Sequence, residues 1–148
     1  MHKKTEVGEI QIGMATAEGV ALTVLAHLRN GEIHDAIACF AEGFTFKDQG
    51  IGLEFKDKER LFEFFRKTRE LYPDSSLETD TIFVSGNCMT IEWTLQTTLT
   101  EPFYGGLSRR LSIVRTENEK GAYWGDYYDG LPSRRSGLAA LFEEWVEL

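Results

Sequence analysis

An aspartate stands between large aromatic residues near the end of the chain, in the segment Trp124–Asp129 (WGDYYD). Side chains alternate between the two faces of a strand, so Trp124, Asp126 and Tyr128 are expected to share one face. A carboxylate is costly inside a core because desolvation disfavours its charge. Asp126 therefore either lies in a cleft with a chemical task, which its aromatic neighbours favour, or pairs with an arginine of a neighbouring strand. The candidate arginines are Arg109, Arg110 and Arg115.

A second aspartate follows the same pattern in the segment Phe44–Asp48 (FTFKD), where Phe44, Phe46 and Asp48 would share a face. Asp48 either begins the turn at residues 49–52, as aspartate often does, or points into a cavity; the sequence weighs the two equally. In an apolar cavity its pKa would rise from the ordinary value of about 3.9, as a general base requires. Two aspartates that converge on one cavity are the reason to expect a function.

Length and composition predict one globular domain over residues 1–148, with residues 1–13 flexible. The fractions of hydrophobic (42%) and charged (27%) residues are ordinary for a soluble protein. A net charge of −8 argues against nucleic acid or an anionic membrane as partner. Neither a signal peptide nor a span of about 20 apolar residues is visible, so we expect a cytoplasmic protein. The two cysteines, Cys39 and Cys88, are expected to be buried, reduced thiols and offer no metal-ligand spacing.

Hydrophobic periodicity and turn residues predict the order helix, helix, strand, helix, several strands and a last helix. Leading helices followed by strands indicate an α+β protein, with a curved mixed or antiparallel sheet wrapped over the N-terminal helices. Such a cone encloses a cavity at its open end, where small ligands bind. The helices are expected at 16–29, 32–40, 57–72 and from 136, and the strands at 44–48, 53–55, 76–85, 88–100, 109–115 and from 121.

This layout resembles the nuclear-transport-factor-2-like superfamily, which includes ketosteroid isomerase, limonene epoxide hydrolase, scytalone dehydratase and the SnoaL-type polyketide cyclases. The resemblance spans residues 16–131, and two segments carry it. Residues 31–48 are similar to the family's unit of a short helix and first strand, and Asp48 falls where ketosteroid isomerase has its catalytic base. Residues 124–129 resemble the last strand of limonene epoxide hydrolase, and the aspartate that helps to activate water there maps onto Asp126.

The chain departs from these relatives at several functional positions. Val24 stands where ketosteroid isomerase has an oxyanion-hole tyrosine, and the isomerase's second oxyanion acid has no counterpart. Trp93 and Leu95 replace the arginine and aspartate of the epoxide hydrolase, and the histidines of scytalone dehydratase are missing. The superfold hosts many activities, so the resemblance implies the fold and two candidate carboxylates but no particular reaction.

The same patterns assign residues to the two faces of the sheet. The outer face, which often forms a homodimer in this superfamily or is otherwise solvated, would carry Tyr127, Glu92, Thr94 and Gln96. Residues expected to line the cavity, or else to pack in an ordinary core, are Phe44, Phe46, Phe65, Met89, Trp93, Leu95, Trp124, Tyr128 and Val24.

Two functions remain open on the sequence. The first is an isomerase, cyclase or dehydratase that uses Asp48 or Asp126 for general acid–base chemistry on a small, mostly apolar or amphipathic molecule, without metal or organic cofactor. The second is a non-catalytic binding or assembly domain with the same cavity. Missing oxyanion donors favour the second, since electrostatic stabilisation is usually the largest catalytic contribution, and the paired aspartates favour the first.

Overall fold

The computed structural model describes residues 16–73, 75–97 and 106–130. Three of the sequence expectations concern residues outside these ranges. They are the flexible segment at residues 1–13, the strand end at residues 98–100 and the helix from residue 136. No helix of the described part of the chain is long and apolar enough to cross a membrane.

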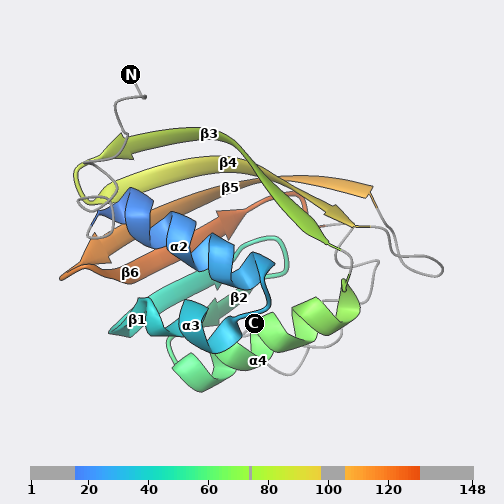
Figure 1. The fold of residues 1–148 in the computed structure, drawn as a ribbon, viewed down its shortest axis with the longest axis horizontal. Coiled ribbons are helices and arrows are strands. Elements are labelled where there is room, and N and C mark those ends of the chain that lie inside the picture. The colour runs from blue at the N-terminus through green and yellow to red at the C-terminus, as the bar shows by residue number, and fades with distance from the viewer. Residues whose placement is uncertain (1–15, 74, 98–105, 131–148) are drawn as a thin grey trace.

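The elements confirm the predicted order (Figure 1). Residues 86 and 87 form the turn between β3 and β4. Two strands are clearly longer than expected. The strand β5 extends the predicted range 109–115 at both ends. The strand β1 begins at Phe40, because Phe40 already pairs with Gly121, and an irregularity that includes Gly43, with a φ of +76°, separates that pair from the rest. The bounds are α2 Ala17–Arg29, α3 Ile33–Ala38, β1 Phe40–Asp48, β2 Leu53–Phe55, α4 Lys58–Leu71, β3 Ser76–Ser85, β4 Cys88–Thr97, β5 Gly106–Glu117 and β6 Lys120–Tyr127.

The strands form one six-stranded mixed sheet in the order β2-β1-β6-β5-β4-β3. The pairing of β1 with β6 is parallel and the other pairings are antiparallel. Figure 1 shows a curved, unclosed sheet with the helices on its concave side, and α2 lies against strands β3 to β6. The α+β cone predicted from the sequence is confirmed.

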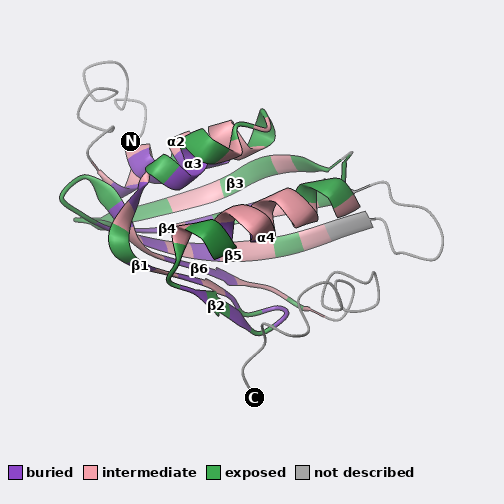
Figure 2. Cartoon of the chain, turned by 90° about the horizontal axis from the view of Figure 1, so that it is seen from below, coloured by how far each residue is buried: buried purple, intermediate pink, exposed green. Residues whose placement is uncertain are grey.

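Alternation along β4 separates the two faces of the sheet as expected (Figure 2). Met89, Ile91 and Trp93 are buried, whereas Glu92 and Gln96 on the outer face are exposed. The two cysteines correct the sequence expectation, because Cys39 is half-buried and Cys88, directly after the hairpin turn, is exposed. Both cysteines are free thiols.

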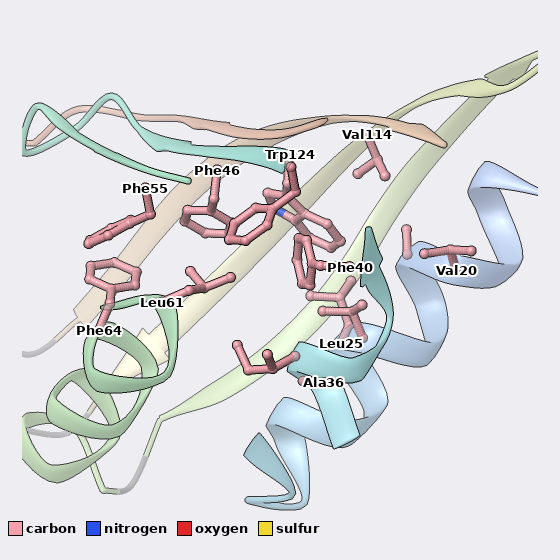
Figure 3. Packing of buried hydrophobic residues seen from close by; sticks show 14 of the residues in the cluster. Val20, Leu25, Ala36, Phe40, Phe46, Phe55, Leu61, Phe64, Val114 and Trp124 are labelled. Carbon is pink, nitrogen blue, oxygen red and sulfur yellow. The ribbon is translucent and has the colours of Figure 1, made fainter. Parts of the chain in front are cut away.

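Aromatic rings fill the core between the sheet and α4 (Figure 3). Phe46 is 2% exposed and stacks on Trp124, with ring centroids 6.4 Å apart. Its ring also contacts Phe40 of the same strand and Phe64 of α4, at centroid distances of 6.3 and 5.8 Å. The inward faces of β1 and β6 are therefore held together by apolar burial as well as by backbone hydrogen bonds.

N-caps lie at residues 16 and 57, where the sequence places the starts of two helices. Thr16 accepts a hydrogen bond from the Gly19 amide at 3.2 Å at the start of α2. Asp57 accepts hydrogen bonds from the amides of Glu59 and Arg60, at 2.7 and 3.3 Å, at the start of α4. These contacts satisfy backbone donors that have no partner inside the helix.

We predict that Asp57→Ala lowers the free energy of unfolding by about 1 kcal/mol, because the first amides of α4 lose their acceptor. Asp57→Ser, which keeps an acceptor, should recover most of the loss. Urea denaturation of the three proteins measures the effect. Equal stability of Asp57→Ala and the wild type would show that the cap contributes nothing.

Candidate active site

The parallel pairing of β1 with β6 places two carboxylates side by side. Asp48 lies opposite Asp126 in the register, and the Gln49 amide extends the pairing by donating to the Asp126 carbonyl oxygen at 2.9 Å. Neighbouring strands are about 4.8 Å apart, so equivalent side chains on one face are in direct reach of each other. Both side chains point inward, at 1% exposure for Asp48 and 7% for Asp126. We call these two residues the carboxylate pair.

A cavity of about 130 Å³ contains the carboxylate pair. Helices α2 and α4 form one wall and the inward faces of the strands form the other, so the lining is mostly apolar and aromatic. Away from the carboxylate pair and Arg110, its polar residues come mainly from the end of α4 and the segment after it. The lining residues are Val24, Leu25, Leu28, Ile33, Phe46, Asp48, Phe64, Phe65, Thr68, Arg69, Tyr72, Ser75, Leu77, Trp93, Leu95, Arg110, Trp124 and Asp126.

The cavity occupies one end of the cone, and this decides which inward-facing residues reach it. Phe44 and Met89, which the sequence assigns to the cavity, lie instead in the core. Phe44 packs on Phe40 at a centroid distance of 5.3 Å, and Met89 pairs with Val114 at the far end of β4. The other expected residues that line the cavity, besides the carboxylate pair, are Val24, Phe46, Phe65, Trp93, Leu95 and Trp124.

Asp48 combines the two roles that the sequence left open. Its Oδ1 accepts a hydrogen bond from the Ile51 amide at 3.2 Å, so it stabilises the turn after β1, and its side chain also faces the cavity. The Tyr128 hydroxyl donates to the same oxygen at 2.6 Å. Burial raises the pKa of Asp48, while the Arg110 charge, the Tyr128 hydroxyl and the amides of Ile51 and Gly50 act in the opposite direction.

Tyr128 does not line the cavity but closes over the turn that holds Asp48. The turn needs a glycine at position 50, because a Cβ there would lie 2.1 Å from the Tyr128 ring. Gly50 thus allows the ring to come close enough for its hydroxyl to reach Asp48.

Asp126 is held by a chain of hydrogen bonds that starts at Trp93. The Trp93 indole donates to the Ser112 hydroxyl at 2.8 Å, and Ser112 donates to Asp126 Oδ1 at 2.5 Å. The Trp124 indole donates to the same oxygen at 2.7 Å. Asp126 Oδ2 has no hydrogen-bond partner among the described residues, so this oxygen is available to a ligand.

Two effects raise the pKa of Asp126 to about 6, and burial is the larger. The negative charge of neighbouring Asp48 is the second, whereas Ser112, Arg110 and Trp124 oppose the rise. The carboxylate pair therefore gives up its two protons in coupled steps, and a state with one shared proton lies between them.

Two polar residues beside the carboxylate pair were not assigned to the site by the sequence interpretation: Arg110, which lines the cavity, and Ser112, which donates to Asp126. The interpretation also missed the other lining residues Leu25, Leu28, Ile33, Phe64, Thr68, Arg69, Tyr72, Ser75 and Leu77. The two polar residues share the inward face of β5 with buried Val114 and Thr116, whereas Leu111 and Ile113 alternate with them on the outer face. The alternation at 110, 112, 114 and 116 was the available signal, but the apolar residues on the opposite face obscure which side is buried. Among the described residues, Asp126 forms no ion pair with Arg109, Arg110 or Arg115.

One other group of side chains has the composition of a metal site. His27, Glu32 and Asp35 bring possible ligand atoms within 4.8 Å of one another near the turn between α2 and α3. The two acids are exposed, His27 already contacts Glu32 at 2.8 Å, and none of the three lines the cavity. The chemistry of the cavity therefore rests on its carboxylates.

Comparison with solved structures places this α+β cone among the nuclear-transport-factor-2-like folds. An NTF2-like protein from Burkholderia thailandensis matches with a TM-score of 0.72 and 13% identity over 82% of this chain and 96% of that one. A protein with a ketosteroid isomerase-like fold from Catenulispora acidiphila, solved with trimethylamine, matches with a TM-score of 0.71 and 19% identity over 84% and 98% of the two chains. An LEH-like epoxide hydrolase from M. tuberculosis matches with a TM-score of 0.64 and 13% identity, over 84% and 92%.

The chain belongs to the SnoaL-like domain family, whose model matches residues 21–125. This range contains Asp48 and ends one residue before Asp126. No curated protein matches the sequence.

We predict that Asp126→Asn stabilises the protein at pH 8 and that the gain vanishes as the pH falls towards 4. The pKa of Asp126 rises on folding from 3.8 to about 6, so the folded chain binds the proton more tightly and loses stability as the pH rises through this window. A shift of this size corresponds to about 3 kcal/mol at most. Thermal unfolding of both proteins from pH 4 to pH 8 measures the difference.

Asp80→Asn is the matched control, because Asp80 is an exposed strand aspartate. Its stability relative to the wild type should not change over the same pH range. An Asp126→Asn variant that is less stable than the wild type at pH 8 would contradict the burial cost assigned to the Asp126 charge.

Proposed function

We propose that this chain binds a small, mostly apolar carbonyl compound in its cavity and moves a proton on it by cofactor-free general acid–base catalysis. The observation that carries the proposal is that Asp48 and Asp126 lie side by side in one apolar cavity. Buried carboxylates whose surroundings separate their pKa values are suited to act as a base and an acid near neutral pH.

The surroundings of the two residues support different roles. Burial raises the pKa of Asp48, as a general base needs, while the Arg110 charge, the Tyr128 hydroxyl and two turn amides limit the rise, so we assign it as the base. Asp126 feels the negative charge of Asp48 and keeps its proton to a higher pH, so it is the acid. Its free Oδ2 is the oxygen that faces the ligand.

The proposed step balances without a further reactant. Asp48 takes a proton from the carbon next to the ligand carbonyl, and the electron pair of the broken C–H bond forms the C=C bond of an enol. The carbonyl oxygen receives the proton of Asp126. Where the ligand also carries a C=C bond next to that carbon, the enol is a conjugated dienol. Asp48 then returns its proton to the far carbon of the diene and Asp126 recovers its own from the enol oxygen, so the C=C bond moves into conjugation with the carbonyl and the ligand is isomerised.

Cavity size narrows the ligand class. A cavity of about 130 Å³ is comparable with the roughly 150 Å³ of an engineered protein cavity that holds benzene. The ligand we propose therefore has a single ring or an aliphatic chain of similar bulk. Phe46, Trp93 and Trp124 supply flat apolar surfaces for it.

The solved structures support catalysis only by analogy, since an epoxide hydrolase is among the similar folds. One observation favours the second candidate, a non-catalytic binding domain. Four donors around the carboxylate pair, on Trp93, Ser112, Trp124 and Tyr128, are already used within the protein. A catalyst needs a further donor for the developing oxyanion.

Catalysis is tested with cyclohex-3-enone, which becomes the conjugated, ultraviolet-absorbing cyclohex-2-enone when a proton moves between carbons. We predict that Asp48→Asn lowers the rate by roughly 100-fold or more, because the base is lost. The wild-type rate should fall as the pH rises above about 6, where Asp126 loses its proton. The Asp126→Asn variant should turn the substrate over more slowly than the wild type. Its rate should not fall as the pH rises above about 6, because residue 126 then has no proton to lose.

Asp80→Asn serves again as control and should keep the wild-type rate and pH profile. Exchange of ligand protons in D₂O, followed by NMR with a panel of small ketones, extends the test beyond one compound. Turnover that is the same in Asp48→Asn, Asp126→Asn and the wild type would remove the carboxylate pair from any mechanism and leave the binding domain.

We further propose a homodimer through the outer face, where Tyr127, Thr94 and exposed Glu92 and Gln96 lie. Its support is the hydrogen-bonded pair of Tyr127 and Tyr123 hydroxyls, 2.7 Å apart, which presents an ordered amphipathic surface there. Light scattering should give twice the chain mass, and Glu92→Lys should shift it towards the monomer. A wild-type mass of one chain would contradict the proposal.

The free thiols support a cytoplasmic location, which recovery of the native protein from a secreted fraction would contradict.

A further inference from the structure

Arg110 is the only arginine among the described lining residues that comes from the sheet, and it lies close to the carboxylate pair without pairing with it. Its guanidinium lies 3.7 Å from the ring centroid of Tyr128 and 5.4 Å from that of Trp93. Its Nε donates to the Ser108 hydroxyl at 3.1 Å. Two aromatic rings and one hydrogen bond therefore fix the position of the guanidinium.

The two terminal nitrogens of Arg110 are unused within the described part of the chain. Arg110 forms no ion pair with Asp48, Asp126 or any other described carboxylate. Its charge still acts on both members of the carboxylate pair and lowers the pKa of each. A cation that is near two carboxylates but donates to neither can donate to a third oxygen, and a ligand in the cavity would supply one.

We infer that Arg110 is the oxyanion-binding residue of this cavity, and that the ligand presents to it a carbonyl oxygen that becomes anionic or a carboxylate. This inference rests on the proposed function for the place of that oxygen, next to the carboxylate pair. It assigns the donor that catalysis was missing, and it narrows the ligand to compounds with an oxygen beside the reacting carbon.

Charge balance supports the assignment. Before proton transfer, the Arg110 charge is offset by ionised Asp48. As Asp48 takes the proton from the ligand, negative charge develops on the ligand oxygen before that oxygen receives the proton of Asp126, and at this stage the oxygen replaces Asp48 as the counter-ion of Arg110. The interaction of Arg110 with the ligand is therefore stronger in the transition state than in the ground state, which is the condition for catalysis.

The test uses benzoate, a one-ring anion that resembles a planar enolate, and neutral benzyl alcohol of similar size. Calorimetric titrations at about pH 5.5 keep benzoate ionised while the Asp126 pKa of about 6 keeps the pair partly protonated. We expect benzoate to bind more tightly than benzyl alcohol. Arg110→Met should weaken benzoate binding by roughly ten-fold or more and change benzyl alcohol binding by less than about two-fold.

Arg109→Met is the matched control, since Arg109 is the adjacent, exposed residue of the same strand, and it should leave both affinities unchanged. Arg110→Lys, which keeps the charge but not the planar fork, should bind benzoate with intermediate affinity. Unchanged benzyl alcohol binding shows that a variant is folded with its cavity intact. If Arg110→Met binds neither compound, the Arg110→Lys variant decides. The inference is overturned if this variant binds benzoate no more tightly than it binds benzyl alcohol.

The inference is also overturned if the wild type binds benzoate no better than benzyl alcohol, or if Arg110→Met keeps the wild-type benzoate affinity. These outcomes are separate from turnover. If cyclohex-3-enone is isomerised in an Asp48-dependent manner but benzoate binding ignores Arg110, the proposed function stands and the inference fails. If no ketone turns over while benzoate binding depends on Arg110, the assignment holds as ligand selectivity and the catalytic proposal fails.

Discussion

Parallel pairing of β1 with β6 is the constraint on which the rest of the site depends. It sets Phe46 beside Trp124 and, two residues later on the same face, Asp48 beside Asp126. The aromatic pair anchors the register through apolar burial, and a slip of either strand by one residue would turn that strand's carboxylate to the outer face. The same register thus stabilises the cone and creates the carboxylate pair, so neither can change without the other.

Burying two acids together is costly, and the surrounding donors limit that cost. Tyr128 and turn amides hold Asp48, while Trp93, Ser112 and Trp124 form a connected network around Asp126. Trp93 and Trp124 each supply both an apolar wall of the cavity and a hydrogen-bond donor. The cavity can therefore stay mostly apolar and still keep charged groups oriented, which is the condition for shifted pKa values.

Membership of the SnoaL-like family establishes the scaffold, and the local substitutions decide what it can do. Trp93 lines the cavity, and its indole supports Ser112 and hence Asp126. The positive charge near the carboxylates comes from Arg110, on the neighbouring strand. Residues of two adjacent strands thus act together on the carboxylate pair.

The sequence by itself determined the order of elements, the starts of α2 and α4 near Thr16 and Asp57, the alternation of β4 and the face that each aspartate shares with its aromatic neighbours. These properties follow from periods of 2 and 3.6 residues and from local hydrogen bonds. Only the tertiary structure decided that the two aspartates are neighbours, that Phe44 and Met89 lie in the core and that Arg110 faces the cavity. These depend on which strands pair and where the cone narrows, contacts between residues far apart in the chain that no local pattern encodes.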